Sequence, residues 1–178
     1  PRLLVLGGSL GALPLNKLLP LALALVPAGQ RPQIRHQCGR QHVDDTRQAY
    51  AAVGVKAEVQ PFIEDMAEAY AWADLVVCRA GALTVAELAA AGRPALLIPL
   101  PHAIDDHQTA NARYLADRGA AELLPQKTLT AELLAQRLGT LLGKPETVRL
   151  MAEQARKQAR PNATADVVRA CLEVAREH

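Results

Sequence analysis

The feature that most constrains the fold is the stretch of residues 74–111, in which two short apolar runs are joined by a helical segment. The runs are residues 75–78 and 95–98, and the helix between them is expected to open at Thr84. Strands joined by a helical crossover pair in parallel, and ligands bind outside the carboxyl ends of such strands. The polar side chains predicted at that edge are the first candidates for a site: Arg79, Thr84, Glu87, Asp105, Asp106, His107 and Gln108.

The same alternation of apolar runs and helical patterns extends along the chain. The predicted fold is α/β, a doubly wound parallel sheet of about six strands in right-handed βαβ units with a helical C-terminal tail, and residues 1–178 are expected to form one domain. Asp44 or Asp45, and Asn162, are the expected N-caps of their helices. Further strands are predicted over residues 3–6, 33–37, 57–60 and 122–124, and helices over residues 11–26, 44–53, 67–73, 108–118, 131–142, 146–159 and 163–176.

Composition excludes several classes of protein. With a net charge of +2, one Phe and one Trp, the chain lacks the basic surface and stacking side chains of a nucleic-acid-binding protein. Three widely spaced cysteines, Cys38, Cys78 and Cys171, indicate reduced thiols. The most apolar run, residues 18–26, is about half as long as a membrane span. The chain begins directly on a strand without an initiator Met, which leaves open that it is part of a longer protein.

Glycines at positions 7, 8 and 11 separate the first strand from the first helix. Such a turn can leave backbone N–H groups free to bind a phosphate, with the Ser9 hydroxyl as an additional donor. The spacing is not that of the dinucleotide fingerprint G-x-G-x-x-G, and no acidic residue ends the second strand, so a nicotinamide cofactor is disfavoured. The alternative is that the glycines serve only a tight turn.

The same turn matches G-x-S-x-G, the nucleophile elbow of α/β-hydrolases. Asp105 or Asp106, and then His107, follow Ser9 in the required chain order. An elbow needs an upstream strand and loop to complete the oxyanion hole, and only six residues precede Gly7. A serine hydrolase built on Ser9 is therefore kept as an alternative, beside a non-catalytic nucleotide-binding module.

Glu87 has two interpretations. With Thr84 it spells a capping box, in which the two side chains satisfy free N–H groups at the helix start. Alternatively, its carboxylate accepts the two hydroxyls of a ribose, while the helix start at Gly81, Ala82, Leu83 and Thr84 faces a diphosphate. The residues alone leave both readings open.

The loop before residue 108 carries a group of potential metal ligands, His102, Asp105, Asp106 and His107. Their spacing matches no common zinc signature, so a metal site is disfavoured. The same side chains could instead hydrogen-bond the hydroxyls of a sugar.

Several motifs, in order and spacing, resemble the C-terminal half of the MurG family, the bacterial N-acetylglucosaminyltransferases of peptidoglycan synthesis. They are GGSLGA, HQCG, the run FIEDMAEAYAWADLVVCRAGALTVAELAAAGRPALLIPLP, and DDHQTANA. The resemblance implies a GT-B enzyme in which this half binds UDP-N-acetylglucosamine and an N-terminal half, absent here, binds lipid I. It also implies a cytoplasmic enzyme that is peripheral on the inner face of the plasma membrane.

The resemblance assigns roles to individual residues. The turn containing Gly8, Ser9 and Gly11 would face the diphosphate, and the backbone of Ile63 would read the uracil edge with Met66 nearby. His107 and Gln108 would hold the N-acetylglucosamine, although some family members carry Gln-Gln there. The helix-start phosphate contacts and the ribose ligand would be Ala82, Leu83, Thr84 and Glu87.

The implied reaction is an inverting transfer to the muramoyl 4-hydroxyl of lipid I, which gives lipid II. In this family it needs no metal or other cofactor. The general base is expected in the other half, so no residue of this chain is assigned a catalytic role.

Overall fold

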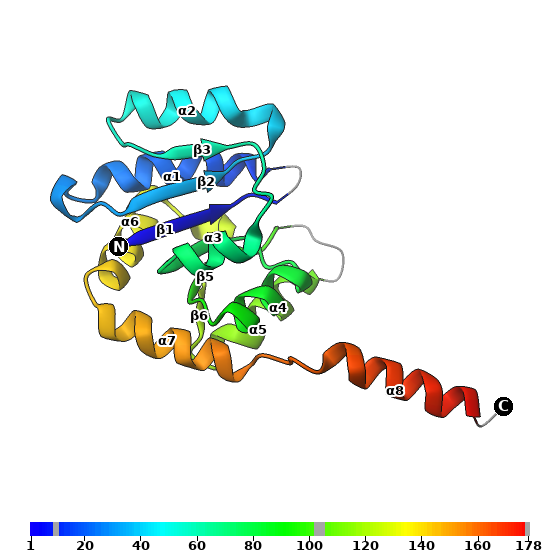
Figure 1. The fold of residues 1–178 in the computed structure, drawn as a ribbon. Coiled ribbons are helices and arrows are strands. Elements are labelled where there is room, and N and C mark those ends of the chain that lie inside the picture. The colour runs from blue at the N-terminus through cyan, green and yellow to red at the C-terminus, as the bar shows by residue number, and fades with distance from the viewer. Residues whose placement is uncertain (9–10, 102–105, 177–178) are drawn as a thin grey trace.

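The computed structural model describes residues 1–8, 11–101 and 106–176. Six parallel strands form one sheet in the order β3-β2-β1-β4-β5-β6 (Figure 1), which confirms the predicted doubly wound architecture. Because the order reverses next to β1, this strand pairs with both β2 and β4. The strands are β1 (Arg2–Leu6), β2 (Gln33–Gln37), β3 (Glu58–Gln60), β4 (Leu75–Cys78), β5 (Ala95–Leu97) and β6 (Ala121–Leu123).

Within the described residues, eight α-helices connect and follow the strands. They are α1 (Leu13–Leu25), α2 (Val43–Ala52), α3 (Met66–Trp72), α4 (Ala82–Ala91), α5 (His107–Ala116), α6 (Ala131–Leu142), α7 (Pro145–Lys157) and α8 (Ala163–Arg176). Three short 3-10 helices are also described, η1 (Ala28–Gln30), η2 (Arg40–His42) and η4 (Gln126–Thr128). Each predicted helix is present: α6 and α8 have the predicted bounds, and the ends of the others differ by at most two residues from the prediction.

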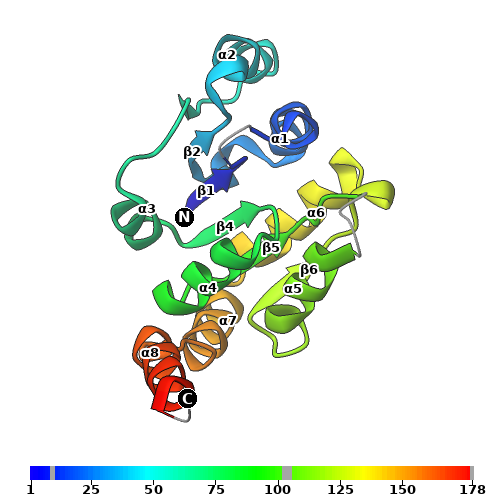
Figure 2. The same cartoon turned by 90° about the vertical axis from the view of Figure 1, so that its right-hand side faces the viewer.

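The central strands are buried on both faces, so their side chains alternate between two apolar layers. Helices α1, α2 and α6 cover one layer, and α3, α4 and α5 cover the other (Figure 2). Helix α7 contacts both α4 and α6, and it contributes Met151 to the first layer and Ala155 to the second. The first layer takes Leu3, Val5, Leu75, Val77, Leu96 and Ile98, and the second takes Leu4, Leu6, Val76, Cys78, Ala95 and Leu97.

The predicted N-cap of α2 is wrong. The helix begins at Val43 directly after η2, and His42 occupies the cap position without a side-chain hydrogen bond. Asp44 and Asp45 therefore lie inside the first turn. The 3-10 turn winds the chain before the aspartates are reached, and their charges act on the helix dipole instead of capping it.

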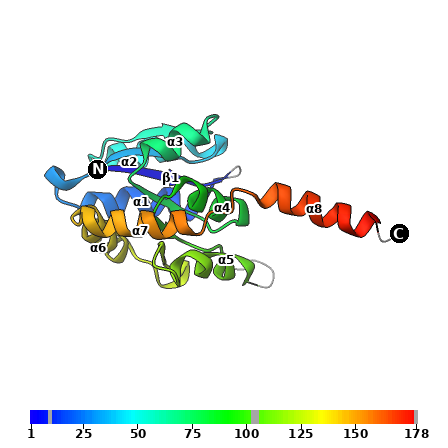
Figure 3. The same ribbon diagram turned by 60° about the horizontal axis from the view of Figure 1, so that its bottom comes forward.

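Helix α8 projects away from the rest of the chain (Figures 1 and 3). Four of its apolar side chains are each more than half exposed, those of Val167, Val168, Leu172 and Val174. The predicted helical C-terminal tail is thus confirmed. None of the described helices combines the length and apolarity needed to cross a bilayer.

A buried series of hydrogen bonds joins β2 to α1 and α2. Nδ2 of Asn16 donates to the carbonyl of Cys38, so Oδ1 of Asn16 faces Nε2 of His36 at 3.0 Å. Nε2 of His36 is therefore the protonated ring nitrogen, and Nδ1 accepts from the Tyr50 hydroxyl at 3.0 Å. His36 is 1% exposed, and a neutral imidazole satisfies both ring nitrogens in this arrangement.

This arrangement predicts a loss of stability in mild acid. Burial lowers the pKa of His36 to about 4 from its ordinary 6.5, so the unfolded chain takes up the proton first as pH falls. The stabilisation is complete above pH 6.5 and is lost between pH 6.5 and 4. Between pH 7 and pH 5, the free energy of unfolding should fall by roughly 2 kcal/mol more in the wild type than in His36→Gln. Urea unfolding at both pH values measures this difference, and parallel losses in the two proteins would contradict it.

Candidate functional site

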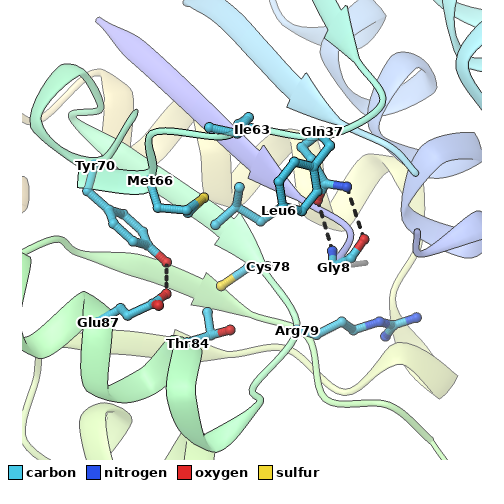
Figure 4. A pocket seen from close by; sticks show the side chains of 11 residues that line it. Leu6, Gly8, Gln37, Ile63, Met66, Tyr70, Cys78, Arg79, Thr84 and Glu87 are labelled. Atoms are coloured by element: carbon cyan, nitrogen blue, oxygen red, sulfur yellow. Dashed lines mark hydrogen bonds between the residues drawn. The ribbon is translucent and has the colours of Figure 1, made fainter. Parts of the chain in front are cut away.

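A cleft of about 170 Å³ opens at the carboxyl ends of β1 and β4 (Figure 4). These strands end together, since Leu6 is in register with Cys78, and they flank the point at which the strand order reverses. That switch point is where open α/β sheets bind their ligands. The cleft is lined by Leu6, Gly8, Gln37, Phe62, Ile63, Met66, Tyr70, Cys78, Arg79, Thr84 and Glu87.

The start of α4 differs from its prediction. The helix begins at Ala82 with Gly81 in the N-cap position, and no side chain caps it. Thr84 therefore lies within the first turn, and the predicted capping box with Glu87 is wrong. Gly81 takes the extended backbone conformation of an N-cap residue, so the helix starts at Ala82, two residues before the predicted start at Thr84. Glu87 is thus free of a capping role, and its side chain reaches the wall of the cleft (Figure 4).

The Glu87 carboxylate is held from the opposite wall by α3. The hydroxyl of Tyr70 donates to Oε2 of Glu87 at 2.9 Å, and the Tyr70 residue is 4% exposed. Burial, followed by the nearby Cys78 and Glu87 groups, raises the pKa of Tyr70, so its hydroxyl stays protonated and remains a donor. Burial also raises the pKa of the Cys78 thiol, to about 12, so this residue is an inert part of the cleft floor.

The glycine turn is less open to an anion than predicted. The N–H of Gly7 donates to the carbonyl and to Oε1 of Gln37, at 2.9 and 3.1 Å. The N–H of Gly8 donates to the same Oε1 at 3.0 Å, and the N–H of Gly11 to the carbonyl of Gly8. These three N–H groups are engaged within the protein, so the predicted phosphate cradle is wrong for them. Ser9 lies outside the described residues.

Gln37 connects the two loops that flank the cleft. Its Nε2 donates to the carbonyls of Gly8 and Pro61, at 3.0 and 3.1 Å, while its Oε1 accepts from the turn. Both polar atoms of the amide are therefore satisfied at 4% exposure. This side chain ties the β1–α1 turn to the segment that carries Ile63. Gln37 is part of the HQCG motif, but nothing in the neighbouring sequence distinguishes such a clamp from a buried strand residue.

Gly11 does not line the cleft but permits a close approach of two turns. Its φ is +75°, and a Cβ atom there would lie 2.2 Å from the carbonyl oxygen of Cys38. The interpretation that the glycines serve a tight turn therefore holds at this position. Gly8, also at positive φ, does line the cleft.

Arg79 follows β4 and lines the cleft beside the helix start. Its guanidinium donates to the carbonyls of Ile98 and Pro99, at 3.1 and 3.2 Å. Burial lowers the pKa of Arg79, although an arginine remains charged at neutral pH. The side chain thus places a positive charge at the edge where β4 and β5 end.

Gln108 joins the turns that follow β4 and β5. Its Oε1 accepts from the N–H groups of Ala80 and Leu100, at 3.3 and 3.0 Å, so only its amide N–H groups are available to a ligand. His107 is exposed at the start of α5. Neither residue lines the cleft. His102 and Asp105, two of the four potential metal ligands of this loop, lie outside the described residues.

The structure thus brings together six of the predicted site residues in the cleft. They are Gly8, Ile63, Met66, Arg79, Thr84 and Glu87. Ala82 and Leu83 lie beside it at the exposed start of α4, where Leu83 is 73% exposed. Tyr70 was missed, although its spacing of four residues from Met66 places the two side chains on the same face of α3.

Comparison with known proteins identifies the family. Residues 2–167 match the family described as glycosyltransferase family 28 C-terminal domain. The chain belongs to this family. The crystal structure of Acinetobacter baumannii MurG has a similar architecture, with a TM-score of 0.90 and 49% identity over 97% of this chain and 52% of that one. The predicted Rossmann-like half of a GT-B enzyme is confirmed.

Related sequences carry a more specific name. A protein of Azotobacter vinelandii is 69% identical over 98% of this chain and 49% of its own length, and one of Stutzerimonas stutzeri is 66% identical over the same shares. Both are named UDP-N-acetylglucosamine–N-acetylmuramyl-(pentapeptide) pyrophosphoryl-undecaprenol N-acetylglucosamine transferase. The chain spans about half the length of these relatives. The glycosyltransferase VinC, at 21% identity and a TM-score of 0.66, shares the fold.

Proposed function

We propose that the chain is the donor-binding domain of an inverting glycosyltransferase that uses UDP-N-acetylglucosamine. The observation that carries the proposal is an uncapped carboxylate, that of Glu87, in a cleft at the switch point of the sheet and beside the start of α4. A carboxylate accepts the two hydroxyls of a ribose, and a helix N-terminus attracts a phosphate. The names of the relatives support this donor and, as acceptor, an N-acetylmuramyl-(pentapeptide) pyrophosphoryl-undecaprenol, which is lipid I. Its muramoyl 4-hydroxyl is the proposed attacking group.

The uracil would lie at the segment after β3. Within the described residues, the backbone N–H and C=O of Ile63 form no hydrogen bond, so both can read the edge of a base. Phe62 and Met66 line the cleft on either side of Ile63 and supply apolar contact for the ring. The ribose would follow at Glu87, on the far side of the same cleft.

The diphosphate would lie at the start of α4. The first N–H groups of a helix have no acceptor within the helix, which leaves those of Ala82, Leu83 and Thr84 for phosphate oxygens. The positive end of the helix dipole, with Arg79 nearby, would stabilise the charge that develops on UDP as it leaves. Ser9 is proposed as a further contact.

The sugar would extend toward α5, where the amide N–H groups of Gln108 and the ring of His107 are proposed to hold the N-acetylglucosamine. Attack of the acceptor hydroxyl on the anomeric carbon would then invert its configuration and release UDP. We propose that the base and the acceptor site belong to the part of the relatives that this chain does not match. An acceptor carried on a lipid would place the whole protein at the inner face of the plasma membrane.

Calorimetric titration of the chain with UDP, UDP-N-acetylglucosamine and UDP-glucose tests the proposal. We expect binding of the first two and weaker binding of UDP-glucose, without transfer of sugar to lipid I. The absence of binding to all three would contradict a donor-binding domain, and transfer by the chain alone would contradict the placement of the base. Ester hydrolysis that is lost in Ser9→Ala would support the hydrolase alternative instead.

A further inference from the structure

We propose that Tyr70 is a positioning residue for recognition of the ribose. Its hydroxyl fixes the Glu87 carboxylate so that the second oxygen faces the two hydroxyls of the donor's ribose. This inference rests on the proposed function, because it assigns a role within the same cleft. It starts from the hydrogen bond of 2.9 Å between the Tyr70 hydroxyl and Oε2 of Glu87, which links α3 to α4 (Figure 4).

Tyr70 is a fixed donor. Its ring is part of the apolar layer that also contains Ala69, Val85 and Leu88, and the residue is 4% exposed. A ring packed in this way has little rotational freedom, and its hydroxyl is the one polar atom of the side chain. The bond to Glu87 therefore comes from a rigid wall of the cleft.

Glu87 is the partner that needs to be fixed. A glutamate side chain has several rotatable bonds, and ordering it when a ligand binds costs conformational entropy. Among the ion pairs of the described residues, none involves Glu87, so no arginine or lysine orients it there. Tyr70 therefore supplies the orientation in advance and removes part of the entropic cost of binding.

The geometry leaves the carboxylate able to bind a diol. Each oxygen of an ionised carboxylate accepts more than one hydrogen bond, so engagement of Oε2 by Tyr70 leaves Oε1 for ribose hydroxyls. A role of this kind acts only through the diol. It differs in this respect from a structural hydrogen bond, whose loss would disturb the whole cleft and weaken every ligand alike.

Tyr70→Phe in the full chain tests the proposal, because it removes the hydroxyl and keeps the ring. We expect the Kd for UDP to rise about tenfold. The Kd for 2′,3′-dideoxy-UDP, which lacks both ribose hydroxyls, should stay within twofold of the wild-type value. Unchanged binding of the dideoxy ligand also shows that the variant is folded. In a Glu87→Ala background, Tyr70→Phe should have no further effect on the Kd for UDP.

Tyr114→Phe is the matched control. Tyr114 lies on α5, and its hydroxyl donates to the carbonyl of Gln158, away from the cleft, so its removal should leave both Kd values unchanged. If Tyr70→Phe weakened the binding of UDP and of the dideoxy ligand equally, or weakened neither, the inference would be overturned. The proposed function would still stand as long as the wild-type chain binds UDP. A wild-type chain that does not bind UDP would overturn both.

Discussion

Replacing Glu87 by alanine is expected to weaken UDP binding at least about a hundredfold while lowering the melting temperature by only a few degrees. A hydrogen bond to a charged group contributes roughly 1.5–3 kcal/mol, and the proposed contact loses two of them. Stability should change little because Glu87 is not the cap of α4, and alanine is the stronger helix former. The remaining cost is the Tyr70 hydroxyl, which loses its partner. Titration calorimetry and thermal unfolding measure the two effects.

Glu153→Ala provides the control for this variant. Glu153 is a glutamate on α7 whose carboxylate is paired with Arg149 at the surface, far from the lining of the cleft. Its replacement should leave the affinity for UDP unchanged. If Glu87→Ala bound UDP within threefold of the wild type, the ribose contact would be wrong. A large loss of stability with intact binding would point to a purely structural glutamate.

Gly11→Ala is expected to destabilise the chain by at least about 3 kcal/mol, which corresponds to a fall in melting temperature of roughly 6–12 °C. The new Cβ atom would lie 2.2 Å from the carbonyl oxygen of Cys38, a backbone atom that can move only if the turn after β2 moves with it. The positive φ of +75° adds strain for any residue with a Cβ atom. Differential scanning calorimetry gives the size of the loss.

Gly54→Ala separates the two contributions. Gly54 has a similar φ of +64°, but no atom lies within 4 Å of the position that its Cβ would take. This variant should lose only the backbone term, about 1–2 kcal/mol. Equal losses in the two variants would contradict the steric contact between Gly11 and Cys38 and leave backbone conformation as the whole effect.

The sheet was predictable from the sequence because its signals are local and repeated. The runs that form β1, β4 and β5 are apolar on both faces, and each is followed by a helical pattern, which together indicate a buried parallel sheet. The polar edge was predictable for the same reason, since Thr84 and Glu87 follow β4 in the sequence and are therefore expected at its carboxyl end. Both the fold and the location of the site are therefore indicated by local sequence patterns.

The details that failed depend on the backbone conformation of a single residue or on contacts between distant segments. Whether Thr84 or Gly81 begins α4 depends on the conformation of one residue, and the spelling of a capping box does not reveal it. The N–H groups of Gly7 and Gly8 are engaged by Gln37, about thirty positions away in the sequence. Such a clamp has no signature in the glycine motif itself, because the motif states only which conformations are accessible.

A crystal structure of the chain with UDP-N-acetylglucosamine tests the central claim most directly. We predict electron density in the cleft between β1 and β4, with both ribose hydroxyls within hydrogen-bonding distance of the Glu87 carboxylate. The uracil edge should contact the backbone of Ile63, and the diphosphate should lie at the start of α4. A donor bound elsewhere on the chain, or in this cleft with the ribose turned away from Glu87, would contradict the account.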